Sequence, residues 1–142
     1  MKSKINLLLL TVVAIVITGC ASGTKFAETR IPALAPEQGR IYFYRTTTLG
    51  AAVQPDVKLN GEKVGSAVPK GFFFADRAPG NYKVESSTEV KRALSLTLDP
   101  GQTRYVRLNM AMGFFVGHVW PELVEPAVGA KEIQKCKSGN KE

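Results

Sequence analysis

The stretch "RALSLTLDPGQTRYVRLN" (residues 92–109) decides the fold, because it contains one complete strand–turn–strand pattern. Leucines alternate with polar residues from Leu94 to Leu98. Successive side chains of a strand point to opposite faces, so this alternation predicts a strand with one apolar and one polar face. The Asp-Pro-Gly run at 99–101 is a turn signal, and residues 103–109 continue as another strand. The stretch therefore predicts antiparallel strands that bury one face.

The same pattern recurs towards the N-terminus. Asn60-Gly61 is a strong hairpin signal, because both residues tolerate a positive φ. A Pro-Gly pair at 79–80 marks a further turn. In "GFFFADR", alternation places Phe72 and Phe74 in the core and leaves Phe73 outward. Besides the pair within 92–109, the expected strands cover residues 39–45, 55–59, 62–65, 71–75 and 81–87.

The expected strands recur at roughly ten-residue spacing with turn signals between them, and nothing in the chain alternates strands with helices. This spacing is typical of an antiparallel β-sandwich rather than of an α/β fold. We expect about seven to eight strands and a short C-terminal helix. The domain is expected to cover residues 39–137, with a flexible tether over 20–38 and a disordered tail over 138–142.

Residues 110–120, "MAMGFFVGHVW", are almost wholly apolar. The run is too short to cross a bilayer as a helix, since that takes about 20 residues. Glycines in it indicate bends or bulges, so we expect one strand near 114–119 and another near 120–124. Its large aromatic side chains are candidates for contact with a partner or a membrane, although burial is the commoner fate of such groups. These candidates are Phe114, Phe115 and Trp120. After them, apolar residues at helical spacing predict the helix over about 129–137.

The N-terminus has the three parts of a secretory signal peptide. Lys2 and Lys4 precede an apolar run over 5–17, and small residues follow, up to Gly19. The ending "ITGC" resembles the bacterial lipobox, in which the cysteine thiol receives a diacylglyceryl group and the chain is cut just before it. We therefore expect residues 1–19 to be a lipoprotein signal peptide, cleaved between Gly19 and Cys20, with lipid such as palmitate on Cys20. An uncleaved anchor helix with a chance cysteine is the alternative.

Lipidation would anchor the protein to a membrane without a spanning helix, because two or more acyl chains hold stably. In Gram-negative lipoproteins an Asp after the cysteine retains the protein in the inner membrane, whereas residue 21 here is Ala. The expected location is therefore the outer membrane, on its periplasmic side.

The net charge is +7, and loss of Lys2 and Lys4 with the signal peptide would leave +5. The basic residues are scattered and no run exceeds two, whereas nucleic-acid binders cluster them. We expect no nucleic-acid partner.

No pattern in the sequence predicts a catalytic or metal site, and no cofactor is expected. The single histidine, His118, lies in the most apolar stretch, and the sequence has no HxxxH, HxH or CxxC motif. Paired carboxylates could come from Glu85 and Glu89 or from Glu122 and Glu125, but nothing in the sequence raises their pKa. Cys136 lacks a partner within the chain if Cys20 is lipidated, and we expect it to pack against the domain. Pairing with another chain is the alternative.

The mature part resembles the DUF2846 family of small bacterial lipoproteins. The resemblance covers about residues 38–136 and is carried by these motifs: "GRIYFYR", "VKLNGEKVG", "GFFFADRAPGNYKV", "LDPGQTRYVRL" and "PELVEPAVGAKEIQK". A strand–NG–strand element followed by PG-x-Y is also similar to PEGA and carboxypeptidase-regulatory-like domains. The resemblance implies a small β-sandwich in the cell envelope and implies no catalytic residues.

These observations favour a non-enzymatic lipoprotein that binds or scaffolds a partner at the cell envelope. A protein of the envelope or the cell wall itself would be the partner. Two alternatives stay open: an envelope hydrolase that uses His118, and a binder of small ligands or cell-wall fragments on the polar face of the sandwich.

Overall fold

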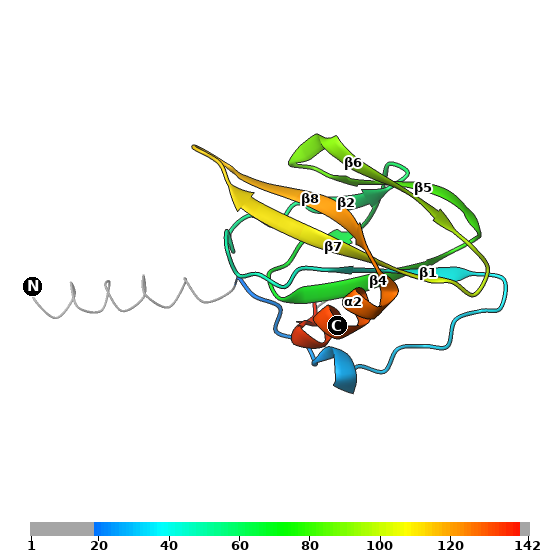
Figure 1. The fold of residues 1–142 in the computed structure, drawn as a ribbon. Coiled ribbons are helices and arrows are strands. Elements are labelled where there is room, and N and C mark those ends of the chain that lie inside the picture. Colours follow the sequence, from blue (N-terminus) through cyan, green and yellow to red (C-terminus); the bar gives the residue numbers. More distant parts are fainter. Residues whose placement is uncertain (1–18, 140–142) are drawn as a thin grey trace, which may run out of the picture.

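The computed structural model describes residues 19–139, except for the side chains of 89–91. The signal peptide expected over 1–19 therefore lies outside the described residues, apart from Gly19, and so do residues 140–142 of the expected tail. The described part is a two-sheet β-sandwich with one short α-helix near its C-terminus (Figure 1), which confirms the predicted fold class. None of its helices is both long and apolar enough to cross a membrane.

One sheet has five strands in the order β8-β7-β1-β4-β9, and the other has four in the order β3-β2-β5-β6. Most pairs are antiparallel, but β1 lies parallel to β7 and β4 parallel to β9. The described residues thus hold nine strands, one more than the upper expected number. Their bounds are β1 Gly39–Tyr44, β2 Asp56–Leu59, β3 Glu62–Ser66, β4 Gly71–Arg77, β5 Gly80–Ser86, β6 Glu89–Leu98, β7 Thr103–Met112, β8 Gly117–Val124 and β9 Lys137–Ser138.

The turn signals lie where the sequence predicts, but they do not all close hairpins. The Asn60-Gly61 turn joins β2 to β3 within one sheet, with both residues at positive φ. The turn at 99–101 instead carries the chain from β6 in one sheet to β7 in the other. A turn sequence fixes the local reversal, while the choice of partner strand depends on which apolar faces meet.

The sandwich core lies between the two sheets and takes the inward side chains of both. Leu96 and Leu98 of β6 face inward, as their alternation predicts. Phe43 and Phe73 stack within it, with ring centroids 4.9 Å apart. The fully or almost fully buried members of this core are Ile41, Phe43, Val57, Leu59, Ala67, Phe73, Ala75, Val84, Leu96, Leu98, Val106, Leu108 and Val119.

The five-stranded sheet is covered on its other face too. A second cluster, called here the outer cluster, consists of Tyr42, Tyr44, Phe72, Ile133 and Cys136 with neighbours such as Phe26. It lies under α2 (Pro126–Glu132), under η2 (Ile133–Lys135) and under an N-terminal 3-10 turn, η1 (Phe26–Glu28). Because both faces are covered, every residue of β1 is buried.

This double covering overturns the prediction for the Gly-Phe-Phe-Phe run of β4. Phe73 points into the sandwich core, whereas Phe72 lies in the outer cluster and Phe74 packs beside it. Alternation shows that neighbours lie on opposite faces, but it cannot identify the inner face when both faces are apolar.

The C-terminal third also differs from the prediction in detail. The two strands expected near 114–119 and 120–124 are one continuous strand, β8, paired with β7 from Val124 to Gly117. Pro121 lies within it without a break, because β8 is at the edge of its sheet, where a missing N–H is tolerated. The α-helix begins earlier than expected, at Pro126, and Ser138 of the expected tail belongs to β9.

Candidate functional site

Cys20, which follows the first described residue, is exposed, and its neighbours are fixed on the domain. The Gly19 carbonyl accepts a hydrogen bond of 2.8 Å from Gln54 Nε2, and the Ala21 N–H donates one of 2.9 Å to the Pro69 carbonyl. Ala21 is buried, while Cys20 between them is exposed. The Cys20 thiol is therefore held at a defined place on the molecular surface.

The segment after Cys20 was expected to be a flexible tether, but its first part lies against the domain. The Gly23 N–H donates to the Ser138 carbonyl, and the Phe26 N–H donates to the Cys136 carbonyl. Between them, the backbones of Lys25 and Lys137 form an isolated antiparallel β-bridge. The Phe26 ring also lies edge-on against Phe72, with centroids 5.0 Å apart. Partial burial of this ring against the outer cluster gives a physical reason for the docking, because an aromatic side chain carries a large apolar area.

The loop between β1 and β2, residues 45–55, is organised by a buried arginine. Arg45 is fully buried, and its guanidinium donates to four backbone carbonyls. Those distances are 2.8 Å to Val53, 2.8 Å to Ala67 and 3.1 Å to Gly50, and Leu49 is the fourth acceptor. Burial lowers the pKa of Arg45, and an electrostatic interaction with Cys20 opposes that shift.

The 45–55 loop contacts Gly19 on one side and the side chains of Met110 and Met112 in β7 on the other. A Cβ atom placed on Gly19 would lie 3.1 Å from the Ala51 Cβ. One placed on Gly50, which has a φ of +61°, would overlap the Met110 side chain and approach Met112 Sδ at 3.3 Å. The loop therefore connects the start of the described chain to the end of β7.

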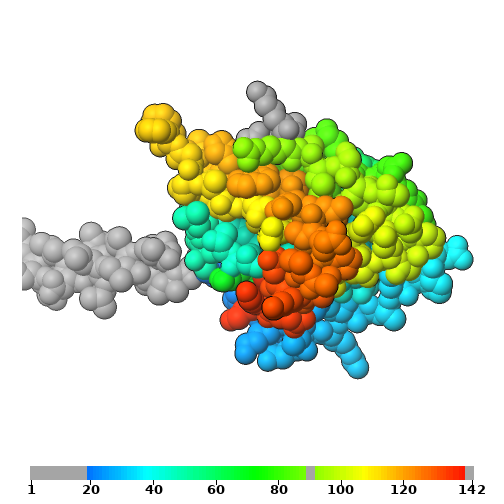
Figure 2. All heavy atoms as spheres, in the orientation of Figure 1, coloured from blue at the N-terminus to red at the C-terminus, as the bar shows by residue number. Residues whose placement is uncertain are grey.

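The hairpin of β7 and β8 ends in a projecting apolar turn. Met112 pairs with Gly117, and the Gly113 N–H donates to the Val116 carbonyl at 2.9 Å. Phe114 and Phe115 are 101% and 97% exposed. We call the exposed apolar residues of this turn the apolar tip: Met112, Phe114, Phe115 and Val116. In Figure 2 the hairpin end is a knob standing out from the body, above the 45–55 loop.

Trp120, the third predicted contact residue, is not part of this tip. It pairs with Asn109, three register steps further from the turn than Met112 and Gly117. It is half-buried, and the Arg92 guanidinium lies 4.8 Å from its ring centroid. The structure thus brings two of the three predicted aromatic residues together and leaves the third on the strand.

His118 and Cys136 occupy ordinary structural positions. His118 is partly buried on β8, opposite Ala111. Cys136 is fully buried, its Sγ lies 3.6 Å from the Arg45 carbonyl, and burial raises the pKa of the thiol to about 11. Within residues 19–139, no group of three His, Cys, Asp or Glu side chains could hold a metal ion.

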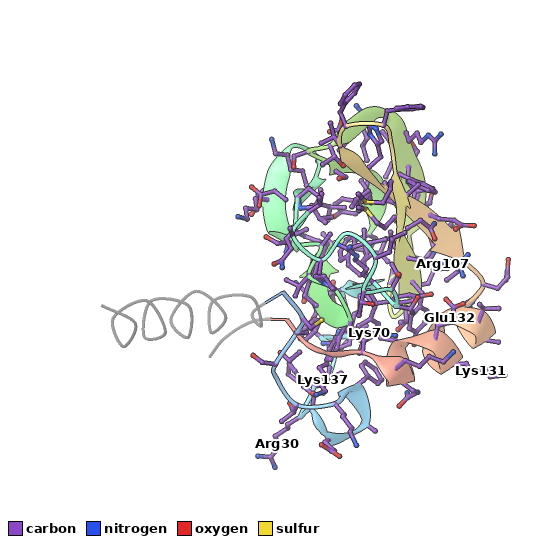
Figure 3. The ribbon with its side chains drawn as sticks, turned by 90° about the vertical axis from the view of Figure 1, so that its left-hand side faces the viewer. Arg30, Lys70, Arg107, Lys131, Glu132 and Lys137 are labelled. Atoms are coloured by element: carbon purple, nitrogen blue, oxygen red, sulfur yellow. The ribbon has the colours of Figure 1, made fainter. Side chains whose placement is uncertain are left out.

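A polar cluster joins α2 to the outer face of β7 and β8, and Glu122 is the member that the sequence analysis names. Arg107 donates to Glu132 at 2.8 Å (Figure 3) and to Glu122 at 2.9 Å, and the Tyr44 hydroxyl donates a hydrogen bond to Glu132 at 2.6 Å. Hydrogen bonds from Arg107 and Asn109 hold the pKa of Glu122 below its usual range. Both carboxylates are engaged by cations or donors, so the cluster fastens the helix to the sheet.

A hollow of about 310 Å³ lies beside β3 and β4 and is lined by residues that include Gln54, Lys63, Phe72 and Phe73. Its charged group, Lys63, forms an ion pair with Asp56 at 2.7 Å. The remaining lining is mostly glycine, serine and apolar side chains, so the hollow has few groups that would orient a polar ligand.

Comparison with known proteins finds a family, a relative and a solved structure that are similar to this chain. The family model DUF2846, a protein of unknown function, matches residues 35–119, more than half of the chain. An uncharacterised protein of Haemophilus influenzae is 26% identical over 130 residues, which cover 87% of this chain and 77% of that protein. The N-terminal domain of AlgF from P. aeruginosa gives a TM-score of 0.43 at 14% identity, covering 63% of this chain and 99% of that domain.

Proposed function

The chain belongs to the DUF2846 family, and from that premise we propose that it is a non-enzymatic lipoprotein of the cell envelope that holds a partner at the membrane. The observation that carries this proposal is the position of Cys20. It follows a signal-peptide-like segment, its thiol is exposed, and its neighbours Gly19 and Ala21 are bonded to the domain.

Lipidation would use the Cys20 thiol as the nucleophile. Its sulfur forms a thioether with the glycerol carbon of a phospholipid, while the phosphate headgroup leaves and the thiol loses its proton. Hydrolysis of the Gly19–Cys20 peptide bond then makes Cys20 the first residue. This cut would remove the Gly19 contact with Gln54 but leave the Ala21 contact with Pro69, so the lipidated residue would stay next to the domain.

The proposed location is the outer membrane, facing the periplasm, because Ala21 rather than Asp follows the cysteine. An anchored domain meets other proteins of the same membrane at a raised effective concentration. Tethering would then be the protein's contribution to a complex. The proposed partner is a protein of the envelope or the cell wall, and it requires no catalytic group on this chain.

The test is the chemistry of the mature N-terminus. The full chain is expressed in a Gram-negative host, its membranes are separated, and the N-terminal peptide is analysed by mass spectrometry. We expect residue 20 to be the first residue and to carry a diacylglyceryl group, in the outer-membrane fraction. Cys20→Ala should abolish the modification, while Ser22→Ala, its matched control, should keep it.

An unmodified Cys20, or a Cys20→Ala variant that stays equally membrane-bound, would contradict the anchor. Crosslinking in intact cells with the same two variants then addresses the partner. A partner crosslinked by wild type and Ser22→Ala but lost with Cys20→Ala supports tethering.

A further inference from the structure

The apolar tip has no structural task that the described domain reveals. Its turn is closed by the backbone bond from Gly113 to Val116, which does not need aromatic side chains. Phe114 and Phe115 lie with their ring centroids 6.3 Å apart and are almost completely exposed. Exposed contiguous apolar groups on a folded protein mark interaction sites, because water disfavours them.

The tip lies at the same end of the molecule as Cys20. In Figure 1 the start of the described chain, the 45–55 loop and the β7–β8 turn all lie at the left-hand end, and the turn projects from it. Contacts link them without interruption. Gly19 approaches Ala51, and Gly50 of the same loop approaches Met112.

We propose that the apolar tip is a second membrane contact, which inserts into the bilayer surface that the lipid on Cys20 occupies and so fixes the orientation of the domain. This inference rests on the proposed lipid anchor. Lipid is the occupant that the geometry favours, because an anchor at Cys20 brings a bilayer to this end of the molecule. A partner protein would have to share that space.

The dimensions and charge of the tip suit a bilayer interface. The turn beyond Met112 and Gly117 carries both aromatic rings past the last paired row of the hairpin, and interfacial segments bury to about 5–10 Å. Residues 110–117 contain no Lys, Arg, Asp or Glu. Near the anchor, the Lys137 N–H donates to the Lys70 carbonyl, and the two lysines lie together beside the chain entry (Figure 3), where they suit anionic headgroups.

The tip is also held firmly enough to orient the domain. β7 and β8 pair continuously along eight rows up to Met112 and Gly117. The loop beneath is fixed by the four bonds of Arg45. Insertion of the tip would therefore constrain the whole sandwich and not only a mobile loop.

The experiment uses the fact that Trp120 is the chain's single tryptophan. A tip reporter combines Phe115→Trp with Trp120→Phe, and the wild-type chain, with its tryptophan on the strand, is the control. Both full chains are purified in lipidated form and placed in phosphatidylethanolamine–phosphatidylglycerol vesicles, with or without bromine on the acyl chains. Bromine quenches tryptophan emission only at short range.

We expect bromine to reduce the emission of the tip reporter at least twofold and to leave that of wild-type Trp120 nearly unchanged. An unquenched tip reporter on a chain whose mass proves lipidation would overturn the second contact while leaving the anchor intact. If the tip tryptophan is instead shielded from water only at high protein concentration, without bromine quenching, the tip contacts a second copy of the chain. That result would overturn the membrane contact. A chain without lipid would instead fail the earlier mass test.

Discussion

Two Gly-Phe-Phe runs in this chain have opposite environments. In the run at 71–73, Phe72 is 3% exposed and Phe73 is 7% exposed. In the run at 113–115, Phe114 and Phe115 are 101% and 97% exposed. The first run lies in β4, between β1 and β9 and covered on both faces, whereas the second lies beyond the last paired residues of an edge hairpin.

The comparison teaches that composition alone does not bury an aromatic residue. Both runs have the same local strand preference, and the elements that pack around them decide the outcome. The buried run supports the fold, and the exposed run is free to contact something else. Four predictions test this division, from the largest expected change in stability to the smallest.

Phe73→Ala should destabilise the protein most. The substitution removes the ring that stacks on Phe43 in the sandwich core, and truncation of a buried Phe costs about 3–5 kcal/mol. Urea unfolding followed by circular dichroism measures the change in the free energy of unfolding. A loss below about 1 kcal/mol would mean that the two runs differ less than their exposure indicates.

Arg45→Met should have the second largest effect and lower the free energy of unfolding by about 2–3 kcal/mol. Four backbone carbonyls lose their hydrogen-bond donor, and water can replace it only if the loop opens. Amide hydrogen exchange should rise in residues 45–55. Arg104→Met is the matched control, since Arg104 donates to the Thr97 carbonyl at an exposed site. Equal losses in the two variants would contradict the role of Arg45 in holding the loop.

Arg107→Gln should have a smaller effect that depends on pH. The folded-state pKa of Glu122 is depressed, so its stabilising contribution is present above the unfolded pKa of about 4.3 and is lost as pH falls through the folded value. The stability difference between wild type and variant should therefore shrink from pH 6 to pH 3. We expect less than about 1 kcal/mol, because Glu122 is half-exposed. Urea unfolding at each pH measures it, and a difference that grows in acid would refute this reading.

Phe114→Ser with Phe115→Ser should change the free energy of unfolding least, by within about 0.5 kcal/mol, because neither ring loses contacts with the domain. Thermal unfolding of the full chain away from membranes checks this. A destabilisation comparable to that of Phe73→Ala would show that the second run also supports the fold and would remove the distinction between the two.

The sequence was informative wherever one local rule acts alone. Alternation from Leu94 to Leu98 and the Asn60-Gly61 pair predicted strands and a turn that the structure contains. Sequence patterns failed where the environment of a residue depends on segments far away in the sequence. Phe72 and Phe73 exchanged faces because a helix and an N-terminal segment cover the outside of β4.

The site shows the same limit. The sequence singles out Cys20, Phe114 and Phe115, but it does not show that they lie at the same end of the molecule. That arrangement depends on the 45–55 loop, which Arg45 holds through hydrogen bonds to backbone carbonyls. Such bonds leave no signature in residue spacing. The pairing of Arg107 with Glu132 joins β7 to a helix and is invisible for the same reason.

The contact between the N-terminal segment and β9 also bears on when the chain can fold. Gly23 bonds to Ser138, and β1 pairs with both β4 and β7. Segments that are synthesised early therefore pair with segments that are synthesised much later. Pairing of segments far apart in the sequence is slow, because the chain loses loop-closure entropy before the stabilising contacts form. Completion of the domain therefore comes after synthesis of nearly the whole chain. That delay would suit the export proposed above, because a chain must still be unfolded to pass through a translocation channel.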